Sequence, residues 1–152
     1  MEHNPHFTEM LQRFNAHNVE FLVVGGYAVM KYSGPQFTKD LDIWIRNAPE
    51  NGERVYSALA ESGAPLSTDQ ITAEDFSSYD ITYPIGRDIP RINIITKIDG
   101  VRFQDAWVHR ILGRLSGVDV HFICREDLIR NREAAGHSGE VERLRHLRKP
   151  EK

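Results

Sequence analysis

Residues 20–45 read EFLVVGGYAVMKYSGPQFTKDLDIWI, two strand-like segments separated by a glycine turn and a short helical segment. The run from Glu20 to Val24 is short and apolar and stops at Gly25-Gly26, as expected of a buried strand that enters a tight turn. A brief helix follows from Tyr27 to Tyr32, and Ser33-Gly34-Pro35 ends it. A buried strand that leads directly into a helix indicates a domain in which helices pack on a sheet.

The segment from Thr38 to Ile45 alternates between two kinds of side chain, which predicts a second strand. One face carries Asp40, Asp42 and Trp44, and the other carries Leu41, Ile43 and Ile45. Two carboxylates on one face repel each other unless something positive lies between them, and a hard divalent ion such as Mg²⁺ suits that position. The alternative is an edge strand whose two acids point into solvent, where charge discourages aggregation.

Gly25 and Gly26 precede this acidic strand by one short helix and a loop. Glycines permit close backbone approach and positive φ, and the N–H groups that open a helix attract an anion. A phosphate at this turn would share its other oxygens with a metal held by Asp40 and Asp42. A Gly-Gly pair taken alone, however, is commonly a turn and nothing more.

The rest of the chain continues the alternation of helical and strand patterns. Apolar residues at three- and four-residue steps from Phe7 to Phe14 predict an opening helix that starts near Asn4-Pro5. Further helices are expected up to Ser62 and at 125–135 and 140–147, with a short helix or turn at 103–109. Further strands are expected at 81–83, 91–98 and 118–123, with a turn at 84–90 and Gly136 as a helix C-cap. This order predicts one α/β (α+β) domain over residues 1–148, followed by a frayed tail at 149–152.

Composition narrows the class of protein further. The chain has 152 residues, of which 40% are hydrophobic and 27% charged, and its formal net charge of −3 argues against a large cationic face for nucleic acid. No apolar run reaches the ~20 residues of a membrane span and no secretory signal is seen, so we expect a soluble, cytoplasmic protein. The single cysteine, Cys124, excludes an internal disulfide and is expected as a small core residue. His109 and most other histidines show no ligand spacing, which places them at the surface or in packing.

The segment VVGGYAV followed by FTKDLDIWI resembles the signature of the nucleotidyltransferase superfamily, most closely its minimal, or AbiEii-like, bacterial members. RINIITKIDGVRF and VDVHFICREDLIRNREAAG also resemble their counterparts there, so the likeness extends over most of the chain. It implies a mixed β-sheet flanked by helices that transfers a nucleoside monophosphate from a nucleoside triphosphate such as ATP. By this resemblance Gly25 and Gly26 hold phosphate, Asp40 and Asp42 ligate Mg²⁺ or Mn²⁺, and Thr38 and Lys39 match nucleotide-binding positions.

The sequence also departs from the family's pattern. The family's third carboxylate, on a later strand, corresponds here to Asn93, and a neutral amide ligates weakly and cannot act as a base. Asp80 or Asp88 are the alternatives for filling that place. A basic position before the first aspartate is Gln36 here.

Towards the end of the chain, a Lys-x-Ala-Ala-Gly-Arg type of segment appears as Arg132 to His137. The resemblance therefore adds Arg132 and His137 to the nucleotide-binding candidates. The alternative is an ordinary pair at a helix end, where positive charge favours the helix dipole.

Two functional hypotheses follow from these residues. The first is an active Mg²⁺-dependent nucleotidyltransferase with Asp40, Asp42 and Asn93 at its catalytic centre and an acceptor hydroxyl on a protein, an RNA or a small molecule. The second is a catalytically impaired nucleotide-binding or regulatory module with a protein partner, such as one half of a toxin–antitoxin pair. Asn93 and Gln36 favour the second hypothesis, and the Gly-Gly and Asp-x-Asp spacing favours the first.

Overall fold

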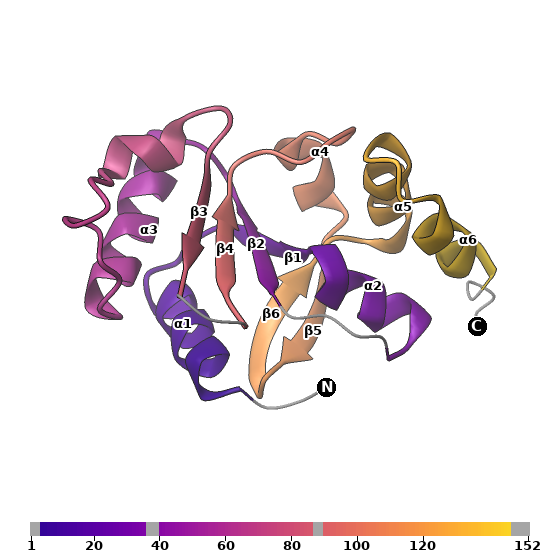
Figure 1. The fold of residues 1–152 in the computed structure, drawn as a ribbon, viewed down its shortest axis with the longest axis horizontal. Helices are drawn as coiled ribbons and strands as arrows, with labels where there is room; N and C mark the ends of the chain where they lie inside the picture. The colour runs from indigo at the N-terminus through magenta and orange to yellow at the C-terminus, as the bar shows by residue number, and fades with distance from the viewer. Residues whose placement is uncertain (1–3, 36–39, 87–89, 147–152) are drawn as a thin grey trace.

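A six-stranded mixed sheet forms the centre of the molecule, in the strand order β3-β4-β2-β1-β6-β5. The computed structural model describes residues 4–35, 40–86 and 90–146 (Figure 1). The strands are β1 (Phe21–Val24), β2 (Leu41–Ile45), β3 (Thr82–Ile85), β4 (Ile92–Ile95), β5 (Ile111–Leu115) and β6 (Val118–Phe122). The helices are α1 (Pro5–Ala16), α2 (Gly25–Ser33), α3 (Pro49–Glu61), the short 3-10 helix η1 (Ala73–Ser77), α4 (Phe103–Val108), α5 (Arg125–Ala134) and α6 (Ser138–His146).

Strand pairing brings distant parts of the chain together at the middle of the sheet. β1 pairs with β2 in antiparallel orientation and with β6 in parallel orientation, and β2 pairs with β4 in parallel orientation. In these registers Asp42 lies opposite Val24 on one side and opposite Asn93 on the other. The end of β1, the acidic start of β2 and the start of β4 therefore meet at one place.

Helices cover both faces of the sheet, as the expected mixed fold requires. α1 and α3 lie together on one side, and α2, α5 and α6 lie on the other (Figure 1). Leu41, Ile43 and Ile45 are completely buried, and Trp44, on the opposite face, packs edge-on against Phe103 of α4 with ring centroids 5.0 Å apart. The predicted alternation of β2 is thus confirmed, although both of its faces are covered and it is a central strand.

The fold class expected from the sequence, helices on a mixed sheet, is confirmed, and several element predictions need correction. β5 was not expected, and β3 reaches Ile85 through the segment predicted as a turn. η1 was also not predicted. α2 begins at Gly25, earlier than predicted, and β4 is shorter than the expected strand at 91–98.

Cys124 differs from its expected role as a core residue. It is half-buried, its thiol is free, and its sulfur accepts a 3.4 Å hydrogen bond from the backbone N–H of Asp127 at the start of α5. A helix begins with unpaired N–H groups, and a side-chain acceptor at the N-cap satisfies one of them. In the part of the chain that the structure describes, no helix has the length and apolar character needed to cross a bilayer.

Candidate functional site

The two aspartates and Asn93 form one hydrogen-bonded group at the edge where β2 and β4 begin. Asn93 Nδ2 donates to Asp42 Oδ1 at 2.9 Å and lies 3.4 Å from Asp40 Oδ2. Neighbouring parallel strands place residues of matching register side by side, so the Asp42–Asn93 pairing follows directly from the sheet. The residue that the resemblance matches to a third carboxylate therefore lies beside both acids.

Gly25 is the reason why the Asp42 carboxylate fits against the end of β1. Its φ is +69°, which favours glycine, and a Cβ added there would lie 2.3 Å from Asp42 Oδ2. The Asp42 carboxylate, which belongs to β2, thus occupies the space that a side chain at position 25 would need. The positive φ expected at this turn is present at Gly25, the group that approaches its backbone is the Asp42 carboxylate, and α2 starts at the same residue.

The electrostatic environment of Asp42 differs from that of an exposed acid. Burial raises its pKa above the ordinary value of 3.8, and the hydrogen bond from Asn93 lowers it. The negative charge of Asp40 raises the pKa further, whereas the positive charge of Arg132 lowers it. A buried carboxylate beside a second one favours a positive partner, whether a proton or a metal ion.

Two arginines lie at the rim of this group. The backbone N–H of Arg91 donates to Asp40 Oδ1 at 3.2 Å, and its guanidinium Nη2 lies 3.8 Å from Asp40 Oδ2. Arg132, on α5, is partly buried and its Nε donates to Glu140 Oε1 of α6 at 2.6 Å. Arg132 was predicted, but Arg91 was not, because its place beside Asp40 follows from strand register. The only signal in the sequence was that Arg91 is the first residue of the predicted strand at 91–98.

Other predicted residues are not brought to this group. His137 is exposed in the connection between α5 and α6, and no hydrogen bond or ion pair between described residues joins it to either aspartate. Asp80 lies exposed before β3, beyond the residue that pairs with Ile95, whereas Asn93 is near the other end of β4. Asp80 therefore does not replace the third carboxylate. Gln36, Thr38, Lys39 and Asp88 lie outside the described residues.

The donor set of this group fits a hard divalent ion. The four carboxylate oxygens of Asp40 and Asp42 are the kind of ligand that Mg²⁺ prefers, and waters or phosphate oxygens complete such sites. The Asn93 amide carries an oxygen as well as a nitrogen, so rotation about its last torsion presents an acceptor to an ion. Asn93 adds no charge, so the group consists of two carboxylates and one neutral amide.

Another hollow is lined by none of the three residues of this group. It has a volume of about 820 Å³ and is bounded by α1, the segment after α3, and the β3–β4 edge. Its ionisable lining residues are His6, Glu9 and Asp69, and Asp69 accepts a 2.7 Å hydrogen bond from the Tyr83 hydroxyl. Because no acids converge there, the hollow lacks the donor set that marks the acid pair, and we place the candidate site at Asp40 and Asp42.

No protein-family model matches this sequence, and no curated protein matches it either. The family resemblance of the motifs accordingly stays a prediction.

Proposed function

We propose that this protein is a Mg²⁺-dependent nucleotidyltransferase that moves a nucleoside monophosphate from a nucleoside triphosphate to an acceptor hydroxyl. The observation that supports this most strongly is the convergence of Asp40, Asp42 and Asn93 beside Gly25. It joins an oxygen-rich cation site to the start of a helix, where N–H groups face outward and attract phosphate. Mn²⁺ has similar ligand preferences and is expected to replace Mg²⁺.

Each residue has a distinct role in this proposal. Asp40 and Asp42 hold the ion through their carboxylate oxygens, and the backbone at Gly25 and Gly26 holds phosphate. Arg91 is placed to neutralise a phosphate oxygen, since its half-exposed guanidinium lies at the rim and its buried Nε has no hydrogen-bond partner among the described residues. The ion itself supplies Lewis-acid polarisation of the phosphoryl oxygens.

The reaction forms one bond and breaks one bond at the α-phosphorus. The acceptor oxygen bonds to this phosphorus while its bond to the pyrophosphate oxygen breaks, so pyrophosphate leaves with the electron pair. The proton of the acceptor hydroxyl passes to water or to a carboxylate, because the Asn93 amide is not a base. Catalysis would depend mainly on positioning and on charge stabilisation by the arginines and the ion.

Labelled nucleoside triphosphates test the proposal directly. The protein is incubated with each of the four labelled triphosphates, Mg²⁺ or Mn²⁺, and protein, RNA or small-molecule acceptors, and transfer of label is measured. Asp42→Asn should reduce transfer on the order of 100-fold or more, because it removes a charged ligand. Asp80→Asn is the matched control, an exposed acid near the opposite end of β4, and should transfer label like the parent.

Transfer that survives in Asp42→Asn at the parental rate would refute the proposed centre. Absence of label transfer with every acceptor class, in a protein that nevertheless binds Mg²⁺ and triphosphate, would instead favour the second candidate function. That candidate is a nucleotide-binding regulatory module, possessing the site without turnover and acting through a protein partner such as the other half of a toxin–antitoxin pair. The hydrogen bonds from the neutral Asn93 amide to both acids favour it, because the amide shields the pair without adding charge.

Asn93→Asp distinguishes the two candidates. It places a third carboxylate between Asp40 and Asp42, so Mg²⁺ affinity measured by calorimetry should rise about tenfold or more, as ligand charge increases. The impaired module would gain transfer activity with this substitution, whereas an active enzyme already has it. Asn47→Asp, beyond the end of β2, is the control for an added charge elsewhere. Equal Mg²⁺ affinity in both variants would show that position 93 does not face the ion.

A further inference from the structure

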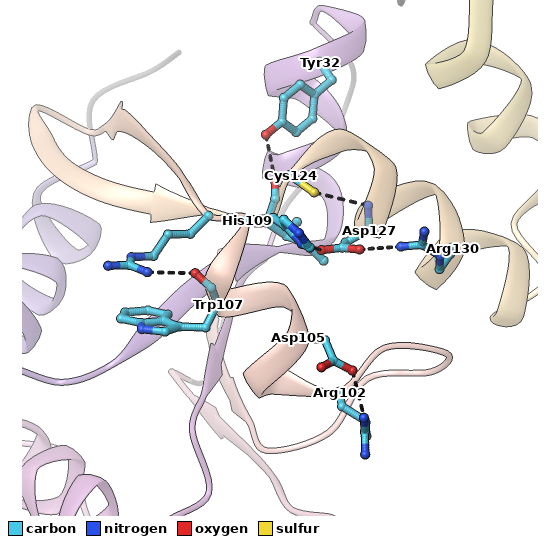
Figure 2. A network of polar contacts seen from close by, with 10 residues as sticks. Tyr32, Arg102, Asp105, Trp107, His109, Cys124, Asp127 and Arg130 are labelled. Carbon is cyan, nitrogen blue, oxygen red and sulfur yellow. Dashed lines mark hydrogen bonds and ion pairs between the residues drawn. The ribbon is translucent and has the colours of Figure 1, made fainter.

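A second group of possible metal ligands lies outside the acid pair, where α4 ends and α5 begins. His109 follows α4, Cys124 is the N-cap of α5, and Asp127 lies in the first turn of α5. One ligand atom of each residue lies within 4.8 Å of the ligand atoms of the other two. Figure 2 shows the imidazole, the sulfur and the carboxylate gathered around one point.

Asp127 is the least accessible member of this group. Only 6% of its side chain is exposed, and its Oδ1 accepts a 2.5 Å hydrogen bond from Arg130. Its Oδ2 is buried and has no hydrogen-bond partner among the described residues. His109 Nδ1 lies 3.6 Å from this oxygen. Burial of an unpaired carboxylate oxygen is costly, so this atom is placed to bind something positive.

We propose that His109, Cys124 and Asp127 bind a Zn²⁺ ion. Imidazole nitrogen, thiolate sulfur and carboxylate oxygen are the three donor types that zinc takes in proteins. The sulfur ligand also selects against Mg²⁺, which takes oxygen ligands, and sets this site apart from the acid pair. Three protein ligands leave a fourth position for water or an outside ligand.

The geometry is close to that of a loaded site. Tetrahedral zinc, with bonds of roughly 2.0–2.3 Å, sets its ligand atoms about 3.3–3.8 Å apart. The His109–Asp127 separation of 3.6 Å already lies in this range. The ligand atoms must still move closer together to reach zinc-binding distances. His109 can make most of this movement, because its side chain is 63% exposed and can turn towards the buried carboxylate. An open hollow of about 460 Å³ is lined in part by Asp127 and Arg130, so solvent comes close to the Asp127 side of the group.

Neighbouring groups support the proposed ligands. Arg130 fixes the orientation of the Asp127 carboxylate, as outer partners commonly do around metal sites. The backbone N–H of Asp127 donates to the Cys124 sulfur. Burial raises the pKa of this thiol, so a bound Zn²⁺ would have to displace its proton, as zinc does at thiolate ligands. This proposal is independent of the nucleotidyltransferase function, because none of its three ligands belongs to the acid pair.

Zinc binding by the full chain, stripped of metal, tests the proposal. A competition titration against a chromophoric chelator should give one zinc per chain. His109→Ala should weaken the affinity on the order of 100-fold, and removal of this exposed side chain leaves the packing intact. His6→Ala, an exposed histidine at the start of α1, is the matched control and should bind like the parent.

The absorption spectrum of bound Co²⁺ distinguishes metal binding through Cys124 from a general change in the structure. Co²⁺ at the same site should show a thiolate charge-transfer band in the near ultraviolet, and Cys124→Ser should abolish it while the circular dichroism spectrum stays that of the parent. Absence of zinc binding, equal affinities of His109→Ala and His6→Ala, or a cobalt spectrum without the thiolate band would each overturn the proposal. In those cases His109 and Asp127 would form an ion pair only.

Discussion

At the scale of single residues, the contact between Gly25 and Asp42 is the most demanding feature of the site. Gly25→Ala combines an unfavourable φ with a Cβ that would lie 2.3 Å from the carboxylate. We expect it to lower the free energy of unfolding by roughly 2–4 kcal/mol and to weaken Mg²⁺ binding, because Asp42 must move. Urea denaturation and calorimetry measure the two effects.

Gly63→Ala is the matched control for this substitution. Gly63 also has a positive φ, of +86°, but a Cβ there meets nothing within 4 Å. Gly63→Ala should lower the free energy of unfolding by about 1–2 kcal/mol, which is the backbone strain alone, and should leave Mg²⁺ binding unchanged. Equal losses of stability in the two variants would mean that the carboxylate yields easily and that Gly25 serves only the turn.

Asp42 also gives the protein's stability a characteristic dependence on pH. Burial raises its pKa in the folded state above the ordinary 3.8, so the folded protein binds this proton more tightly than the unfolded chain does. The contribution of Asp42 to stability is therefore full below 3.8 and is lost as the pH rises through the folded pKa. Asp42→Asn should gain stability relative to the parent as the pH increases across that interval. Denaturation curves at a series of pH values measure this difference, and a constant or opposite trend would contradict it.

At the scale of elements, the junction between α5 and α6 holds Arg132 in place. Gly136 has a φ of +83°, and the N–H groups of Gly136 and His137 bond back to the carbonyls of Glu133 and Arg132, as in a Schellman motif. Gly136→Ala should cost about 1 kcal/mol, because only glycine adopts this conformation freely. Thermal unfolding measures the change.

Gly139, three residues later in α6, provides a comparison of opposite sign. A Cβ at Gly136 or at Gly139 meets open space, but Gly139 is helical and has no positive φ. Gly139→Ala should therefore raise stability, by up to about 1 kcal/mol, since alanine favours the helix. A loss of stability in both variants would contradict the expectation that helix propensity decides the effect at Gly139.

The elements that the sequence failed to predict share a physical cause. β5 lies at the edge of the sheet and exposes Ile111 and Leu112, so it lacks the alternation that burial of one face imposes. Its turn to β6 has positive φ at Ser116 and Gly117, a weaker signal than Asn-Gly or Asp-Gly. In β3, Pro84 indicated a turn, yet proline is tolerated in an edge strand.

Residues of the candidate site could be predicted where the local sequence determines their position. They could not be predicted where their position depends on the register between paired strands. Gly25 and Asp42 belong to one short stretch whose turn and alternation can be read directly. Asn93 was placed by family resemblance, and its contacts with both acids depend on parallel pairing of β2 with β4. The grouping of His109 with Cys124 arises from packing between elements, which no spacing in the sequence expresses.

At the scale of the whole molecule, all six strands belong to one sheet, which predicts a single cooperative unfolding transition. Trp44 lies buried in the central strand β2, and the other tryptophan, Trp107, lies on α4. Tryptophan fluorescence and far-ultraviolet circular dichroism should give coincident urea curves, as expected of one domain. Separate midpoints would show that α5 and α6 unfold independently of the sheet.

The pairing of β2 with β4 has a consequence for the newly made chain. Asp42 and Asn93 are 51 residues apart. At translation rates of about 5–20 residues per second, the two acids are made roughly 3–10 seconds before the amide that shields them. During this interval the nascent polypeptide contains the two acids of the β2 segment without the amide that pairs with them. Cations in solution can screen the two carboxylates until Asn93 has been made.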